Sequence, residues 1–165
     1  MASITLVSSD GIEYLVLADI TKQSKTLYDL IEATGSDVIH LAGGVEGAAL
    51  AYVISYCLFH AADTEPPPML DLSKPRIPGT PIVVGYWDST FCIDCSDELV
   101  WKINHAANYL DVRPLVDLMA YTIAMRLLDM THAQIYAQFD ITEPITAEEE
   151  AQILKENPWL SDNPK

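Results

Sequence analysis

Basic residues are scarce in this chain of 165 residues. Nine lysines and arginines stand against 24 aspartates and glutamates, which gives a formal net charge of −15 at pH 7. So acidic a surface repels the phosphates of a nucleic acid and the anionic surface of a membrane. The composition therefore predicts that the chain binds neither a nucleic acid nor a membrane.

Cysteines and long apolar runs are also few. Three cysteines do not make a disulfide framework, so a reducing compartment is the simpler interpretation. The longest uncharged stretch in the middle of the chain, residues 47–62, is shorter than the roughly 18–20 apolar residues that a membrane-spanning helix needs. Residues 1–5 show no basic region followed by an apolar core, as a signal peptide would. These features predict a soluble protein of the cytoplasm and nucleus.

Apolar residues are abundant, at 50% of the chain, and the length suits one domain with its own core. Two short apolar segments, residues 4–7 and 12–17, flank Asp10-Gly11, a strong signal for the turn of a β-hairpin. A third strand is expected at 38–41, and a helix follows the turn at Gly43-Gly44. The N-terminal part is therefore predicted to combine a small sheet with helices.

Further helices are predicted from residues that can cap a helix. The first cap is Ser24, and Gly35 is expected to end its helix. The other caps are Ser96, Asp111, Thr131 with Gln134, and Thr146 with Glu149. From residue 96 onward the chain is therefore expected to be largely helical.

Residues 61–81 differ in kind, because they hold six of the ten prolines. Proline neither donates to a β-ladder nor continues a helix, so an extended or disordered loop is expected here. Neither flanking part looks self-sufficient. We therefore favour an insertion within one domain over a boundary between two lobes.

No residues with catalytic, cofactor-binding or metal-binding chemistry are predicted. The sequence lacks a Walker loop, a Gly-x-Ser-x-Gly elbow and a His-Glu-x-x-His motif. Cys92 and Cys95 have redox or zinc spacing, but Cys57 is far away in sequence, so ordinary thiols are favoured over a zinc or redox site. The glutamates of 148–150 suit the first turn of a solvated helix better than a cation site. The four histidines, which are scattered along the chain, are His40, His60, His105 and His132.

The segment 112–128 has more apolar surface than one side of a helix needs. A surface helix requires an apolar stripe about 100° wide to cover its own core. In this segment the apolar residues extend around the helix beyond one such stripe, and the residues that extend it are Leu115, Leu118 and Met125. Two interpretations stay open, a fully buried central helix and a helix shared between the core and a partner.

The segment 140–165 contains seven acidic residues and two lysines, and its apolar residues form only a thin stripe. At roughly 25 cal/mol per Å² buried, such a helix gains barely enough to offset the ordering of about a dozen residues. The segment is therefore expected to become stable when a partner covers it. Packing onto its own domain is the alternative.

Several short motifs along the chain have to be considered together. They are Ser8–Gly11, Lys22–Ser24, Trp87-Asp88 with Phe91, Ala106–Asp111, Leu115–Asp117, Phe139–Ile141 and Thr146–Trp159. These motifs resemble the S-phase-kinase-associated adaptor family of SCF ubiquitin ligases. The resemblance covers nearly the whole chain and is gapped only at the proline-rich segment. Part of Ala106–Asp111 is shared with relatives of elongin C, and the C-terminal segment distinguishes the SKP-type adaptor from them.

The resemblance implies an α/β (α+β) fold of the BTB/POZ type, with a small three-stranded sheet, a helical body and two additional C-terminal helices. Residues 1–128 would form the BTB/POZ-like domain, with the proline-rich loop at about 61–81 and the cullin-binding surface. Residues 129–165 would form the extension that completes the F-box-binding surface. Members of the family have no enzymatic activity and need no cofactor, and they bridge a cullin to an F-box protein that selects the substrate.

The resemblance also implies which residues bind. Asn108 and Tyr109 match the family motif that contacts the cullin. The residues carried over to the F-box-binding surface are Val116, Ala120, Ile123, Leu127, Phe139, Ile141, Ile153, Leu154 and Trp159.

Departures from the family pattern indicate a divergent member. The loop, usually acidic, carries Lys74 and Arg76, and Ala147 stands where some relatives have a modified proline. A cullin-independent interaction module therefore stays an alternative, for example in a kinetochore complex, in a vacuolar-ATPase assembly complex or as a BTB-type homodimer. Weak homodimerisation also stays open for the chain without its partner.

Overall fold

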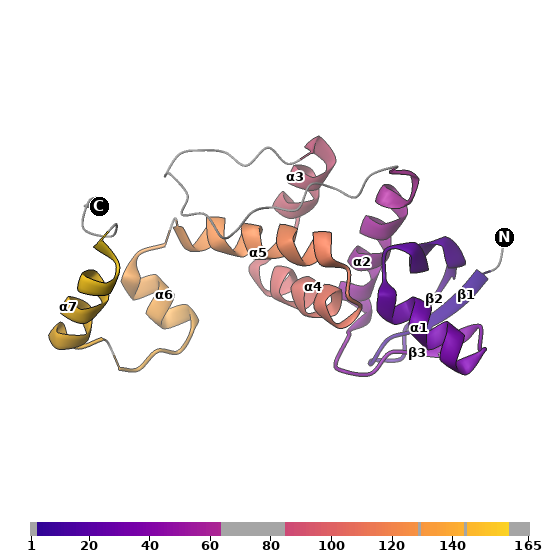
Figure 1. Ribbon diagram of the computed structural model, residues 1–165, viewed down its shortest axis with the longest axis horizontal. Coiled ribbons are helices and arrows are strands. Elements are labelled where there is room, and N and C mark those ends of the chain that lie inside the picture. The colour runs from indigo at the N-terminus through magenta and orange to yellow at the C-terminus, as the bar shows by residue number, and fades with distance from the viewer. Residues whose placement is uncertain (1–2, 64–84, 129, 144, 159–165) are drawn as a thin grey trace. The chain divides into compact units, whose positions relative to one another are not determined.

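The computed structural model describes residues 3–63, 85–128, 130–143 and 145–158 (Figure 1). It divides the chain into two compact units, Met1–Arg126 and Leu127–Lys165. The predicted boundary after residue 128 stays a prediction. The described elements, in chain order, are β1 (Ser3–Val7), β2 (Glu13–Leu17), η1 (Ala18–Lys22), α1 (Lys25–Thr34), β3 (Val38–His40), α2 (Gly47–Phe59), η2 (His60–Ala62), α3 (Tyr86–Ile93), α4 (Asp97–Tyr109), α5 (Arg113–Leu128), α6 (His132–Gln138) and α7 (Ala147–Glu156).

The sheet has the strand order β2-β1-β3, with β1 antiparallel to β2 and parallel to β3. The predicted Asp-Gly turn joins β1 to β2, with Gly11 at φ 81° and its N–H donating to the carbonyl of Ser8. Thr5 on β1 pairs with Leu15 on one side and Val38 on the other. Alternate residues therefore face the core, and the residues buried there are Ile4, Leu6, Val16 and Ile39.

Helix α1 begins and ends where the sequence predicts. The hydroxyl of Ser24 accepts a hydrogen bond from the N–H of Leu27 at 3.2 Å and donates to the carbonyl of Leu110. Gly35 ends the helix in the left-handed conformation, at φ 60°. Because Ser24 is fully buried, this single side chain caps α1 and also ties it to the end of α4.

The hydrophobic core lies where α2 meets α4. Helix α2 buries residues on several sides, among them Leu50, Val53 and Tyr56, so it is the central helix of the first unit. Helix α4 presents one buried stripe, which consists of Val100, Ile103, Ala106 and Ala107. Each large side chain that is fully buried stabilises the fold by roughly 1.5–3 kcal/mol relative to an exposed one. This core fixes the end of α4, where the predicted cullin-binding residues lie.

Helix α3 is held against the end of α2 by a histidine and an aromatic cluster. His60 is buried, with Nδ1 2.6 Å from a carboxylate oxygen of Asp63 and Nε2 3.0 Å from one of Asp88. Trp87 stacks on Phe59 with ring centroids 4.2 Å apart. The first two residues of the predicted proline-rich loop, 61 and 62, belong to η2, and residues 64–81 lie outside the described residues.

The second unit contains α6 and α7. Both begin with the predicted capping boxes, Thr131 with Gln134 and Thr146 with Glu149. Of the described residues from Leu127 onward, none is buried.

Among the helices that the structure describes, none combines the length and apolar character needed to cross a membrane. The architecture confirms the predicted α+β class, a small three-stranded sheet with a helical body and two C-terminal helices.

Candidate partner-binding surfaces

The predicted cullin-binding residues lie at the end of α4. Asp111 adopts a left-handed conformation at φ 54°, and its N–H donates to the carbonyl of Asn108 at 3.2 Å. The N–H of Val112 donates to the carbonyl of Ala107 at 2.9 Å, which completes a Schellman motif. Asp111 therefore ends α4 and does not directly precede α5 as its cap, contrary to the prediction. The turn leaves Asn108 exposed and Tyr109 half-buried.

The ring of Tyr109 packs against the loop between β3 and α2. A Cβ atom on Gly43 would lie 2.8 Å from Cδ2 and Cε2 of Tyr109, and Gly43 itself has φ 72°. The carbonyl of Gly43 accepts a hydrogen bond from Nε2 of His105 at 2.6 Å. Thr26 on α1 donates to the carbonyl of Tyr109 at 3.2 Å. Three segments far apart in sequence therefore position this tyrosine.

Gly43 and His105 were not among the predicted binding residues. The two consecutive glycines were a usable signal, because such pairs occur where the backbone needs positive φ. By itself the pair predicts only a turn. Nothing in the sequence indicated that His105 would reach this loop.

Lys102 on α4 holds the other end of this loop, where α2 begins. The ammonium of Lys102 lies 2.8 Å from a carboxylate oxygen of Glu98 and 2.9 Å from one of Glu46. Hydrogen bonds to Glu98 and then to Glu46 raise the pKa of Lys102 above its ordinary value. Lys102 is therefore charged at neutral pH and connects the start of α2 to the middle of α4.

Four of the predicted F-box-binding residues share one face of α5. Val116, Ala120, Ile123 and Leu127 follow one another at intervals of four, three and four residues, and all are half-buried. The buried residues of this helix are Leu115, Leu118, Met119 and Thr122. Helix α5 is therefore not a fully buried central helix, because only the side that carries these four residues is buried in the core.

Four further predicted residues belong to the second unit, and all are partly exposed. The exposed fractions are 41% for Phe139, 42% for Ile141, 40% for Ile153 and 41% for Leu154. Trp159, the last predicted residue, lies outside the described residues. The same unit also exposes Leu128 and Ile145. The roles of all these residues in F-box binding stay predictions.

The cysteines are free thiols, and two of them are buried. Burial raises the pKa of the Cys57 thiol to about 12 and that of Cys95 to about 11. Both are therefore protonated at neutral pH, whereas nucleophilic or metal-binding cysteines are thiolates. Within the described ranges, no group of three or more His, Cys, Asp or Glu side chains is arranged to hold a metal ion.

Comparison with known proteins identifies the family. The chain is 33% identical over 163 residues to the E3 ubiquitin ligase complex SCF subunit sconC of Neosartorya fischeri and to that of Aspergillus fumigatus, which covers 98% of this chain and 100% of each relative. The model of the Skp1 family tetramerisation domain matches residues 2–62, and that of the Skp1 family dimerisation domain matches residues 113–160. This chain belongs to the Skp1 family. The resemblance drawn from the motifs is therefore confirmed.

Membership of the Skp1 family also confirms the predicted BTB/POZ-like fold. The tetramerisation (POZ) match covers the sheet, α1 and α2, and the dimerisation match covers α5 to α7. The end of α4, with Asn108 and Tyr109, lies between the two matched ranges.

Proposed function

We propose that this Skp1-family protein is a non-catalytic adaptor of an SCF-type cullin–RING ubiquitin ligase. It binds a cullin at Asn108 and Tyr109, and it binds F-box proteins through α5 and the C-terminal helices. The proposal is supported by the SCF subunits to which the chain is similar over their full length. A cytoplasmic and nuclear location belongs to the same proposal.

The observation that carries the proposal is the second unit. Its helices have complete capping boxes, yet its described side chains build no buried core, and four apolar side chains are about two-fifths exposed. Covering the exposed part of each such side chain yields on the order of 1 kcal/mol. A partner helix laid on this unit gains stability that the unit does not obtain from itself.

The end of α4 suits a different kind of contact. The Schellman turn and the packing of Tyr109 on Gly43 hold this surface in one conformation before a partner arrives. A preorganised aromatic side chain loses little entropy on binding, which is why tyrosines often dominate the affinity of an interface. We therefore assign the cullin to this surface.

Two substitutions test whether the surfaces act separately. Tyr109→Ala is expected to weaken binding of the cullin N-terminal region about tenfold, because it removes a preorganised aromatic contact, and to leave F-box affinity unchanged. Ile153→Asp is expected to weaken F-box binding and to leave the fold intact, since Ile153 is 40% exposed. Isothermal titration of each purified partner into the full chain measures both effects.

Tyr28→Ala is the matched control, because Tyr28 is an exposed tyrosine on α1 outside both surfaces. Equal cullin affinity of the wild type and Tyr109→Ala would argue against the cullin assignment. An F-box complex that binds no cullin at all would indicate a cullin-independent module. A stable dimer in sedimentation, unaffected by F-box addition, would indicate a homodimeric function instead.

A further inference from the structure

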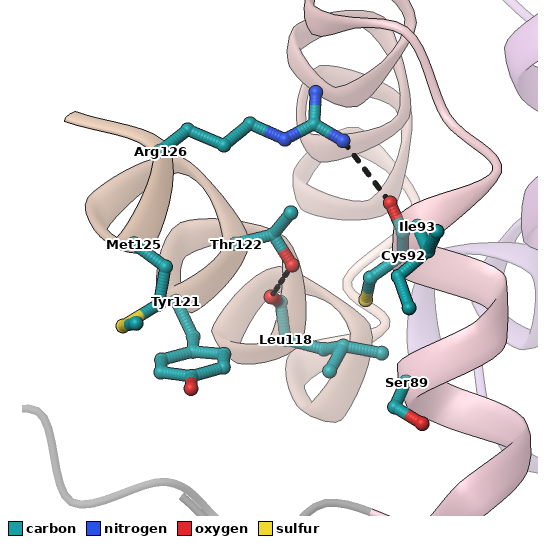
Figure 2. Close-up of a pocket in the computed structure, with 8 residues that line it drawn as sticks. All are labelled: Ser89, Cys92, Ile93, Leu118, Tyr121, Thr122, Met125 and Arg126. Carbon is teal, nitrogen blue, oxygen red and sulfur yellow. Dashed lines mark hydrogen bonds between the residues drawn. The ribbon is translucent and has the colours of Figure 1, made fainter. Parts of the chain in front are cut away.

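Helices α3 and α5 border an apolar groove that the proposed function does not use. Its cavity measures about 340 Å³ and lies within the first unit (Figure 2). Helix α3 contributes Cys92 and Ile93. Helix α5 contributes Leu118, Tyr121 and Met125. We call this site the α3/α5 groove.

The α3/α5 groove and the predicted F-box-binding face lie on opposite sides of α5. At about 100° per residue, Met125 lies about 180° around the helix axis from Val116, and Leu118 lies about 200° from it. A chain that covers Val116 and Ile123 therefore leaves Met125 accessible. This geometry explains why α5 is apolar on more than one side.

Polar contacts within the protein hold the groove in shape. Figure 2 shows Arg126 reaching from α5 to the carbonyl of Cys92, at 3.0 Å, and the same guanidinium donates to the carbonyl of Cys95 at 2.6 Å. It also pairs with the carboxylate of Asp97 at the start of α4. The hydroxyl of Thr122 donates to the carbonyl of Leu118 at 2.9 Å. A groove fixed in this way needs little ordering when a ligand enters.

Exposed apolar side chains surround the groove. Ile93 is 78% exposed, and Tyr86, seven residues earlier on the same side of α3, is 89% exposed. Met125 is 37% exposed on the opposite wall, and methionine adapts its shape to different ligands. Apolar side chains left exposed on the walls of a groove favour its use in a protein interaction.

The charge of the surroundings indicates the kind of occupant. The acidic side chains of Asp94 and Asp97 are exposed beside the groove, while Arg126 is already paired with Asp97. A second copy of this chain would bring another net charge of −15 to an acidic rim. A segment with basic residues beside its apolar anchors is attracted instead. An amphipathic helix is the element that packs between two helices by such anchors.

We propose that the α3/α5 groove binds an amphipathic helix of a protein partner, with apolar side chains entering the cavity and basic residues facing Asp94 and Asp97. On α5 this site is separate from the face that carries Val116 and Ile123, and its lining does not include Asn108 or Tyr109.

Two matched peptides probe the site on the full chain. Both carry leucine and phenylalanine anchors at positions i, i+4 and i+7, and one has flanking lysines and arginines while the other has glutamates. Fluorescence anisotropy at low salt is expected to show about tenfold tighter binding of the basic peptide, with the difference shrinking as salt screens the charges. In methyl NMR, the signal of Met125 is expected to shift while that of the buried Met119 stays in place.

Ile93→Gln is expected to weaken binding of the basic peptide about tenfold, because it removes an exposed apolar contact without adding charge. Leu15→Gln is the matched control, since Leu15 on β2 is 76% exposed and outside the groove. F-box and cullin affinities are expected to stay unchanged in Ile93→Gln, so the result is independent of the proposed function.

Three outcomes would overturn the proposal. The first is no binding of either peptide, or equal binding of both. The second is an equal loss of affinity in Ile93→Gln and Leu15→Gln. The third is self-association of the chain that Ile93→Gln abolishes, because the occupant would then be a second copy.

Discussion

At the residue scale, the contact between Gly43 and Tyr109 links a loop to the proposed cullin surface. The left-handed backbone of Gly43 and the absence of a side chain allow the tyrosine ring to lie directly on the loop. Any other residue would have to displace the ring, because a Cβ at 2.8 Å from ring carbons is too close. Gly43 is therefore a positioning residue for Tyr109.

Gly43→Ala is expected to reduce cullin affinity several-fold, because the methyl group moves the ring of Tyr109 from its bound position. Gly35→Ala is the control, since Gly35 also has positive φ but a Cβ there meets no atom within 4 Å. Both variants carry backbone strain of similar origin, of order 1 kcal/mol. Titration with the cullin N-terminal region distinguishes the two variants. An equal loss of cullin affinity in both would mean that backbone strain alone causes the loss.

At the element scale, α6 and α7 offer a natural comparison of two capping boxes. The α6 box uses the neutral Gln134, whereas the α7 box uses Glu149, which accepts hydrogen bonds from the backbone N–H and then the hydroxyl of Thr146. These bonds lower the pKa of the Glu149 carboxyl below its ordinary value of 4.5. The two helices therefore differ in how their ends respond to acid.

Helix α7 is expected to fray at acid pH before α6 does. The lowered pKa means that the contribution of Glu149 is present above pH 4.5 and is lost as the pH falls through the lower folded-state value. Carbon chemical shifts of α7 and α6, followed from neutral pH downward, measure the difference. Glu149→Gln should reduce the pH dependence at the start of α7 and keep the cap. Parallel loss of both helices, unchanged in this variant, would contradict the explanation.

At the scale of the whole molecule, the two compact units differ in what stabilises them. The first unit has a continuous core that runs from β1 to α5, whereas the described part of the second contains no buried side chain. Local opening of a structure costs little where few apolar contacts are lost. The second unit is therefore the part of the molecule whose stability depends most on a partner.

Amide hydrogen exchange of the isolated chain is expected to be slowest in α2 and α4 and fast throughout α6 and α7. Opening of the C-terminal helices should cost close to zero, against the full free energy of unfolding for the core helices. Adding a purified F-box protein should slow exchange in α6 and α7 more than in α2. Exchange in free α7 as slow as in α4 would contradict an uncovered second unit.

Features that depend on near neighbours in the chain could be predicted from the order of the residues. The Asp-Gly hairpin, the caps at Ser24 and Ser96 and the two capping boxes follow from hydrogen bonds between residues two or three positions apart. Matches to family motifs likewise need only the order of residues. For this reason the α+β class and the family were predictable.

The sequence also misjudged positions whose environment depends on distant parts of the fold. Leu58 continues the apolar spacing of α2 but is 45% exposed, although Cys57 and His60 of the same turn are buried, because it lies on a side of the helix that the core does not cover. Asp111 was expected to cap a helix, yet it ends one, since the αL conformation is set by how α4 and α5 connect. Helix α5 left two interpretations open because apolar spacing does not state which sides are covered.

The construction of the binding surfaces could not be predicted in this way, because it depends on contacts between distant segments. Tyr109 lies on Gly43, Arg126 joins α5 to the end of α3, and His60 meets Asp88 across a long separation in sequence. Such contacts form when packing of the core brings distant segments together, and local patterns do not encode their distances or angles. The α3/α5 groove therefore emerged from the fold alone, although every residue that lines it was visible in the sequence.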